Sequence, residues 1–392
     1  MEGGIIKVCM ISYSQYEDDS RIHRYAASLI AAGHQVDMIG LGNKGQPKRE
    51  MIYGVMVYRL QSRDFNEKSP FSYLWRLVQF FVSSSFFCSA LYAKKRYDVI
   101  HYHNIPDHGI FCTLIPKLFG AKIILDIHDI VPEFYMRKFE VQETHWVIKA
   151  LKQIEKWAAS YADLVITVTD IWKDRLIERS VKPEKCLVIM NVPDYKLFNP
   201  AICKNKISTE FIFSYHGNLS ETTGVGTAIQ AFASVSLQMP NARMRIIGQG
   251  RRKTEYSQLI QDLHLENEIS ILDVVPVTDI PLLLCEASVG LDPKEGGIYA
   301  GETLSVKAME YLGMEIPVIV SKTDASSRYF TDQMVAYFDP GNTEEMASRM
   351  LELYQSNEKR KQLIEQGRNF TQKYNWKNFE QAYLHRLAQL VS

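Results

Sequence analysis

Short apolar runs alternate with amphipathic segments along the whole chain of 392 residues. In the first half the apolar runs are IIKVCMIS, QVDMIGL, YDVIHYH, AKIILDIHD and DLVITVT, and segments such as RIHRYAASLIAAG separate them. The second half repeats the pattern with FIFSYHG, RMRIIGQG, EISILDVV, ASVGLDP and IPVIVS. Apolar runs of this length are typical of buried parallel strands that are connected by helices. The pattern therefore predicts an α/β protein with two Rossmann-like, doubly wound domains.

The two repeats of the pattern meet in NVPDYKLFNPAICKNKISTE, residues 191–210, where prolines and polar residues interrupt the apolar runs. Such a segment is typical of a domain boundary. We therefore predict an N-terminal domain at residues 1–195 and a C-terminal domain at residues 196–370. Residues 371–392 follow as an amphipathic helix, for which we predict packing back on the N-terminal domain.

Polar residues and glycines follow several of the apolar runs. His103 and His128 do so in the first half, and Gly217, after His216, and Gly250 do so in the second. In open parallel sheets, ligands bind beyond the carboxyl ends of the strands, so these residues are predicted to face a binding cleft. Each of them also has an ordinary explanation, such as a histidine buried in the core or a glycine in a turn.

The stretch GETLSVKAMEYLGMEIPVIVS, residues 301–321, reads as a loop, a helix and a buried strand, with Lys307 in the first turn of the helix. A helix N-terminus is already positively polarised, so a lysine there indicates that an anion is bound nearby. The alternative is that Lys307 simply extends into solvent. Arg251 is a second candidate cation for the same anion. The backbone N–H groups that are expected to bind this anion are those of Thr303, Leu304, Ser305 and Val306.

Several classes of function are disfavoured by what the sequence lacks. The first apolar run leads into SYSQYEDDS without a GxGxxG motif, and no P-loop, GxSxG or HExxH motif occurs. No Asp-x-Asp pair is present to hold a metal on a diphosphate. The chain has 45 basic and 45 acidic residues, so it has no net field to attract nucleic acid. We therefore expect no metal, no cofactor and no nucleic-acid partner.

The six cysteines lie far apart in the sequence and form no CxxC pair. This spacing predicts neither a zinc site nor a disulfide framework, and we expect a reducing, cytoplasmic location. The N-terminal MEGGIIKVCMIS lacks the features of a signal peptide.

Residues 70–98, PFSYLWRLVQFFVSSSFFCSALYAKKRYD, form the longest apolar and aromatic segment. Arg76, Gln79 and several serines interrupt it before it reaches a clean membrane-spanning length. Two interpretations stay open: the segment packs against the sheet, or it is an amphipathic helix that contacts a membrane with an aromatic face. The residues concerned are Trp75, Phe80, Phe81, Phe86 and Phe87, with the basic Lys94, Lys95 and Arg96 after them.

The chain resembles the family 4 glycosyltransferases of the GT-B fold over nearly its full length. Glu302 and Glu310 are separated by seven residues and followed by Pro317 and a strand, which is similar to the Glu-x7-Glu motif of that family. Further matches, in the order of the family, are YDVIHYHN, LDIHD, ADLVITVT, IMNVPD, YHGNL and RIIGQG.

The resemblance implies a retaining transfer in which Glu310 holds the ribose of a nucleotide-sugar and Glu302 contacts the transferred sugar. His128 matches the histidine that contacts the sugar from the N-terminal domain, and Lys307 faces the diphosphate. The catalytic set is therefore expected to be His128, Glu302 and Lys307. The nucleotide-sugar is expected to contact Gly217, Asn218, Gly250, Arg251, Val275, Thr303, Leu304, Ser305, Val306 and Glu310.

Two positions depart from the family pattern, because Asn218 and Thr223 stand where many members carry Arg and Lys.

The leading hypothesis is a transferase that moves a sugar from a nucleotide-sugar, with a UDP-sugar favoured, to a polysaccharide or lipid-linked glycan at the inner face of a membrane. The alternatives are a catalytically weak relative that binds nucleotide-sugar or glycan, and a GT-B sugar epimerase.

Overall fold

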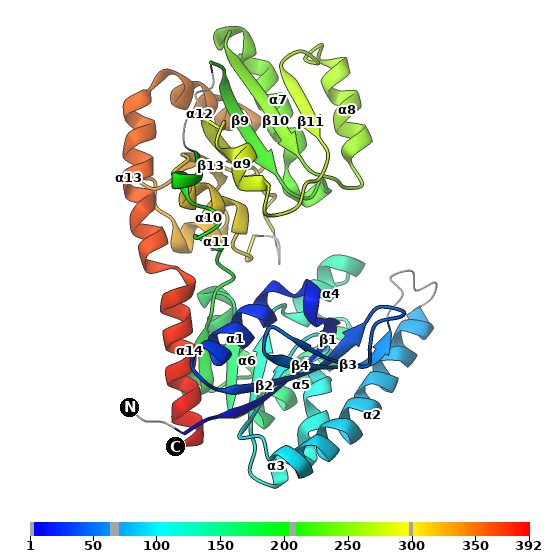
Figure 1. The fold of residues 1–392 in the computed structure, drawn as a ribbon. Coiled ribbons are helices and arrows are strands. Elements are labelled where there is room, and N and C mark those ends of the chain that lie inside the picture. Colours follow the sequence, from blue (N-terminus) through cyan, green and yellow to red (C-terminus); the bar gives the residue numbers. More distant parts are fainter. Residues whose placement is uncertain (1–3, 63–69, 204–208, 298–300) are drawn as a thin grey trace. The chain divides into compact units, whose positions relative to one another are not determined.

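The computed structural model describes residues 4–62, 70–203, 209–297 and 301–392. The chain divides into two compact units, which we call the N-terminal unit (Met1–Asn191 with Phe379–Ser392) and the C-terminal unit (Val192–Asn378). Each unit contains a largely parallel sheet covered by helices, as Figure 1 shows. The predicted fold class, two doubly wound α/β domains, is therefore confirmed.

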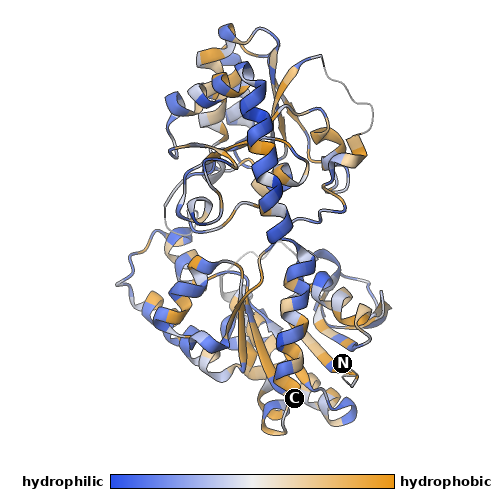
Figure 2. Ribbon diagram, turned by 90° about the vertical axis from the view of Figure 1, so that its left-hand side faces the viewer, coloured by the Kyte–Doolittle hydropathy of each residue, from blue (hydrophilic) through white to orange (hydrophobic). Residues whose placement is uncertain are grey.

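The sheet of the N-terminal unit has eight strands among the described residues, in the order β3-β4-β2-β1-β5-β6-β7-β8. The strands are β1 (Lys7–Gln15), β2 (Gln35–Gly42), β3 (Arg49–Ile52), β4 (Val55–Ser62), β5 (Val99–His103), β6 (Lys122–Ile127), β7 (Leu164–Thr167) and β8 (Cys186–Val188). Among these described strands, only β3 is antiparallel to its neighbour. The central strands are buried on both faces, which explains their continuous apolar runs. Their hydrophobic character is visible as orange ribbon in Figure 2.

The helices of this unit are α1 (Ser20–Ala31), α2 (Pro70–Lys95), α3 (Leu114–Leu118), α4 (Val131–Phe139), α5 (Trp146–Tyr161), α6 (Asp170–Arg179) and most of α14 (Trp376–Val391). Helix α1 begins where the Asp19 carboxylate accepts hydrogen bonds from the backbone N–H groups of Arg21 and Ile22, both at 3.2 Å. Helix α14 packs on the same unit through Tyr383, which is fully buried and whose hydroxyl lies 3.1 Å from Nδ1 of His101.

The sheet of the C-terminal unit has six strands among the described residues, in the order β11-β10-β9-β12-β13-β14. The strands are β9 (Phe211–His216), β10 (Ala242–Ile247), β11 (Ile269–Leu272), β12 (Val289–Asp292), β13 (Val318–Ser321) and β14 (Ala336–Phe338). The helices are α7 (Val225–Val235), α8 (Lys253–Asp262), α9 (Ile280–Leu284), α10 (Val306–Gly313), α11 (Asp324–Tyr329), α12 (Thr343–Gln355) and α13 (Asn357–Lys373). All strand pairs described are parallel.

Helix α2 packs one face into the core of the N-terminal unit and exposes another. Leu77, Phe80 and Tyr92 are buried, whereas Trp75 is 56% and Phe86 is 75% exposed. The aromatic residues expected to form one face are thus divided between the core and the surface. By length and composition alone, Ser72–Lys95 is also apolar enough to cross a membrane.

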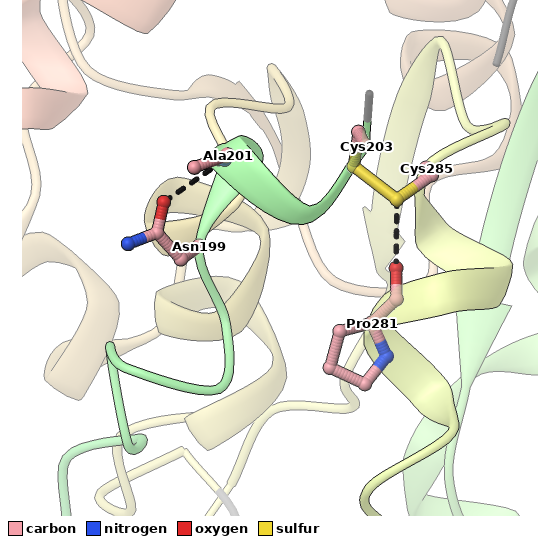
Figure 3. Close-up of a disulfide and its surroundings, with 5 residues drawn as sticks. All are labelled: Asn199, Ala201, Cys203, Pro281 and Cys285. Carbon is pink, nitrogen blue, oxygen red and sulfur yellow. Dashed lines mark hydrogen bonds between the residues drawn. A yellow bond between two sulfur atoms is a disulfide. The ribbon is translucent and has the colours of Figure 1, made fainter. Parts of the chain in front are cut away.

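The cysteine spacing led us to expect no disulfide, and this expectation is wrong. Cys203, at the end of the short 3-10 helix η4 (Pro200–Cys203), is bonded to Cys285, directly after α9 (Figure 3). The two residues are 82 positions apart, but the fold brings their Cα atoms to 5.2 Å. Asn199 Oδ1 accepts a 2.9 Å hydrogen bond from the backbone N–H of Ala201 and so shapes the turn that presents Cys203. The other four cysteines are buried free thiols.

Candidate functional site

Predicted nucleotide-sugar residues of the C-terminal unit follow three neighbouring strands: Val275 follows β11, Gly250 follows β10 and Gly217 follows β9. Asp292, which was not among the predicted residues, ends the next strand, β12. The strand order reverses its direction of growth between β9 and β12, which is where open α/β sheets bind ligands. Helix α10 begins beyond this point, so the residues of the Glu-x7-Glu segment are positioned beside the switch point.

Three glycines allow the loops after β9 and β10 to pass each other closely. A Cβ on Gly248 would lie 1.9 Å from the carbonyl oxygen of Gly217, and one on Gly250 would lie 2.2 Å from that of Leu219. Gly217 itself has φ of +128°, in the region that favours glycine. The loops are tied together by a 3.0 Å hydrogen bond from the N–H of Leu219 to the oxygen of Gln249. Larger residues at Gly248 or Gly250 would therefore push the two loops apart.

Lys307 lies in the first turn of α10, as predicted, and its side chain reaches back over the loop after β9. A Cβ on Gly217 would lie 3.2 Å from Cδ and 3.8 Å from Nζ of Lys307. Nζ is 3.6 Å from Oδ1 of Asp292 and 5.4 Å from the centre of the Tyr215 ring. Burial lowers the pKa of Lys307, but Asp292, Tyr215 and Glu310 outweigh it and raise the pKa above its ordinary value. Lys307 is therefore a cation held beyond the carboxyl ends of the central strands β9 and β12, and its side chain lies against Asp292 and Tyr215 instead of extending freely into solvent.

Glu310 lies one turn after Lys307 and is held by a buried hydrogen-bonded chain. Its Oε2 is 2.6 Å from Nε2 of His216, and Nδ1 of His216 is 3.0 Å from the hydroxyl of Tyr311. That hydroxyl donates to the carbonyl oxygen of Ser214 at 2.6 Å. The chain fixes the orientation of the Glu310 carboxylate relative to β9.

The remaining predicted residues of the C-terminal unit lie in the loops after β9, β10 and β11 and at the start of α10. Ser305 is the N-cap residue of α10 without a side-chain capping bond, and Val306 is the first helical residue. Glu302 is 6% exposed, whereas Arg251 is exposed. Thr303 and Leu304 are intermediate in burial, as is Val275, whereas Asn218 is exposed.

Sequence reasoning missed Lys294, which follows β12 in the segment LDPKEGG. Its Nζ donates a 2.7 Å hydrogen bond to the backbone oxygen of Thr303 and also contacts the Thr303 hydroxyl. Lys294 thereby fixes the loop that leads into α10. A basic residue two positions after a strand end was the available signal. Thr223, in contrast, closes a local turn with Ser220.

In the N-terminal unit, His128 follows β6 and lies in a cluster of histidines around Asp126. His128 Nε2 is 3.0 Å from Oδ2 of Asp126, and the side chain of His128 is 18% exposed. His103 Nδ1 is 3.2 Å from the same oxygen, and His101 Nε2 is 3.7 Å from it. His101 and His103 are completely buried, and burial lowers the pKa of both. Only His128 offers part of its ring at the surface.

Arg21 completes this cluster from helix α1. Its Nε donates to Oδ2 of Asp126 at 3.0 Å and its Nη2 donates to Oδ1 at 2.8 Å. His101, His103 and Asp126 have donor atoms within 4.8 Å of one another, as a metal site requires. Because a guanidinium already occupies both carboxylate oxygens, a second cation is disfavoured there.

Comparison with known proteins agrees with this geometry. The model of a glycosyl transferase 4-like domain matches residues 19–191, and that of glycosyl transferases group 1 matches residues 202–370. Two similar proteins are the putative colanic acid biosynthesis glycosyltransferase WcaL of Escherichia coli and the sulfoquinovosyl transferase SQD2 of Arabidopsis thaliana. The first is 28% identical over 158 residues, 40% of this chain and 39% of that protein. The second is 21% identical over 372 residues, 91% of this chain and 68% of that protein.

Two solved structures are similar to the chain over almost its whole length. Sucrose-phosphate synthase from Thermosynechococcus elongatus has a TM-score of 0.76 and 18% identity, and covers 99% of this chain and 100% of its own. HepE of Anabaena, solved in complex with UDP, has a TM-score of 0.72 and 15% identity, and covers 98% of this chain and 100% of its own. These likenesses and the two parallel-sheet units define a glycosyltransferase of the GT-B fold. More narrowly, the chain belongs to the family 4 type of these enzymes.

Proposed function

We propose that this protein is a retaining glycosyltransferase that moves a sugar from a nucleotide-sugar, with a UDP-sugar favoured, to a polysaccharide or lipid-linked glycan. The observation that carries the proposal is the placement of Lys307 beside Gly217 at the start of α10, with Glu310 one turn later. This arrangement suits a diphosphate against the lysine and the helix N-terminus, and a ribose against the carboxylate. Charge builds on the diphosphate as the glycosidic bond breaks, and cations already placed there lower the barrier.

In this proposal, residues 196–370 bind the donor and residues 1–195 bind the acceptor. Arg251 and the N–H groups of residues 303–306 assist Lys307 at the diphosphate, and the loops at Gly217, Asn218, Gly250 and Val275 contact the nucleotide. Glu302 and His128 contact the hydroxyls of the transferred sugar. No divalent metal is required, because cations and a helix N-terminus supply the charge. HepE, which is similar in structure, has also been solved with UDP-glucose, and this supports the proposal of a UDP-sugar donor.

We further propose that the N-terminal unit contacts the inner face of a membrane through α2. Leu74, Val78, Val82 and Phe86 recur every four residues and are 42–75% exposed, so they form one apolar stripe along the helix. Helix α2 contains no acidic residue, and Lys94 and Lys95 lie in its last turn. An apolar stripe that ends in basic residues suits an anionic lipid surface.

The proposed function is tested by screening nucleotide-sugars for thermal stabilisation and then for transfer. A donor present at about 100 times its dissociation constant stabilises the folded state by roughly 2.7 kcal/mol, which a melting curve resolves. Stabilisation with transfer to a glycan acceptor is the expected result. Stabilisation without any turnover would favour the non-catalytic alternative. That alternative is motivated by Asn218 and Thr223, which stand where many family members carry basic residues. A changed sugar in the absence of acceptor would indicate an epimerase.

A further inference from the structure

The Asp126 carboxylate is the centre of the buried network in the N-terminal unit, and it contacts the one histidine of the cluster that reaches the surface. We propose that Asp126 is a positioning residue, which holds the proton of His128 on Nε2 so that Nδ1 accepts a hydrogen bond from a sugar hydroxyl. This inference rests on the proposed function, because it explains how His128 is prepared for its sugar contact.

The proton positions follow from the charge of Asp126. Burial raises the pKa of Asp126, but Arg21 and the neighbouring histidines outweigh it and hold the pKa well below its ordinary value. An ionised carboxylate only accepts hydrogen bonds, so Nε2 of His128 and Nδ1 of His103 must both carry a proton toward Oδ2. The 3.3 Å approach of those two nitrogens is therefore a contact between two donors and not a hydrogen bond.

The second nitrogen of His128 is then free to accept. Nδ1 of His128 makes no hydrogen bond to another residue in the described part of the chain, and the ring is 18% exposed. The second ring nitrogen of His103, Nε2, likewise has no hydrogen-bond partner among the described residues, but it is completely buried. Of the two rings held by Asp126, only that of His128 can meet a ligand.

The backbone around His128 is fixed as firmly as its ring. Asn104 Oδ1 accepts a 2.8 Å hydrogen bond from the N–H of His128, and Asn104 Nδ2 donates a 2.9 Å bond to the carbonyl oxygen of Asp129. Arg21 is anchored in turn, because its Nη1 donates to the oxygen of Ile189 at 2.8 Å and to Oδ1 of Asn191 at 2.7 Å. Ring orientation and main-chain position are thus both set before a ligand arrives, as preorganised sites require.

The tautomer is tested directly on the wild-type protein, without any activity assay. In a nitrogen-15 histidine-labelled sample at pH 7.5, long-range nitrogen–proton correlation distinguishes protonated from unprotonated ring nitrogens. Comparison with His128→Gln assigns the His128 signals among the ten histidines. We expect a proton on Nε2 and none on Nδ1. A proton on Nδ1, in either the other neutral form or the imidazolium, overturns the proposal whether or not the proposed reaction is correct.

Kinetics then test whether Asp126 acts through His128. We expect Asp126→Asn to lower kcat by about tenfold or more with a much smaller change in the donor KM, since the loss is one of geometry. Added to His128→Ala, the same change should cause no further loss in kcat, because residues that act as a unit are non-additive. If the loss in kcat of the double variant were instead the product of the losses of the two single variants, the proposal would be overturned. Tyr383→Phe removes another bond of the same cluster, to His101, and is the control for general loosening.

Discussion

Replacing Glu310 by alanine should weaken nucleotide binding by an amount that the site geometry allows us to estimate. The Glu310 side chain is 12% exposed, and His216 takes only Oε2, so Oε1 remains for a ribose hydroxyl. A hydrogen bond to a charged acceptor is typically worth about 1.5 to 3 kcal/mol. At 1.4 kcal/mol per factor of ten, the dissociation constant for UDP should rise roughly 10- to 150-fold. Isothermal titration calorimetry of UDP with the wild-type and variant proteins measures this change.

The matched control is Glu315→Gln, because Glu315 is a carboxylate near the other end of the same helix and pairs only with Arg368 among the contacts described, at 2.7 and 2.8 Å. This variant should bind UDP as the wild type does. Glu310→Ala also leaves Nε2 of the buried His216 without its partner, so a melting curve must show that the variant is folded at the titration temperature. A folded Glu310→Ala protein with unchanged affinity for UDP would refute the assignment of Glu310 to the ribose.

Four further outcomes are expected. His128→Ala should lower turnover far more than it raises the apparent donor constant in steady-state kinetics, and wild-type turnover in a folded variant would contradict its role. Activity should survive a chelator, and complete loss that is restored by a divalent metal would show that the cations of the site are insufficient. Burial raises the pKa of Asp107 from 3.8 to about 7, so its ionised form costs the folded state up to about 4 kcal/mol at pH 8 and nothing below pH 3. Asp107→Asn should therefore resist urea better than wild type at pH 8 but not at pH 3. Replacing the exposed Trp75 and Phe86 of α2 by serine should reduce flotation with anionic vesicles, and equal flotation would remove the membrane proposal.

The architecture was predictable from the sequence because its signal is local. Strands such as β6 and β13 are buried on both faces, so each appears as an uninterrupted apolar run. The short strand β3 was not predicted, since REMI is largely exposed at a sheet edge and has no apolar run. The sequence also could not show which face of α2 is buried. Phe80 and Phe86 are equally apolar, and only the packing distinguishes the buried ring of Phe80 from the exposed ring of Phe86.

The candidate site was predictable to the extent that its residues belong to one segment. Lys307 and Glu310 lie three positions apart on one helix, so their spacing alone places them near each other. The partners that orient them, Asp292 and His216, come from different strands and give no sign of this role in the sequence. The same is true of Arg21, which is 105 residues from Asp126. Contacts over such separations depend on the strand order and not on any local pattern.

The Cys203–Cys285 disulfide has a consequence for the integrity of the chain after cleavage. Strands β9, β10 and β11 all lie between its two cysteines, so a protease that cuts once within this interval produces two fragments that remain covalently joined. Such a nicked molecule keeps the full mass on a gel without reductant and separates into two bands only after reduction. A single cut outside the interval separates the fragments under both conditions. Gel mobility with and without reductant therefore reports whether the chain has been cut between Cys203 and Cys285 or outside that interval.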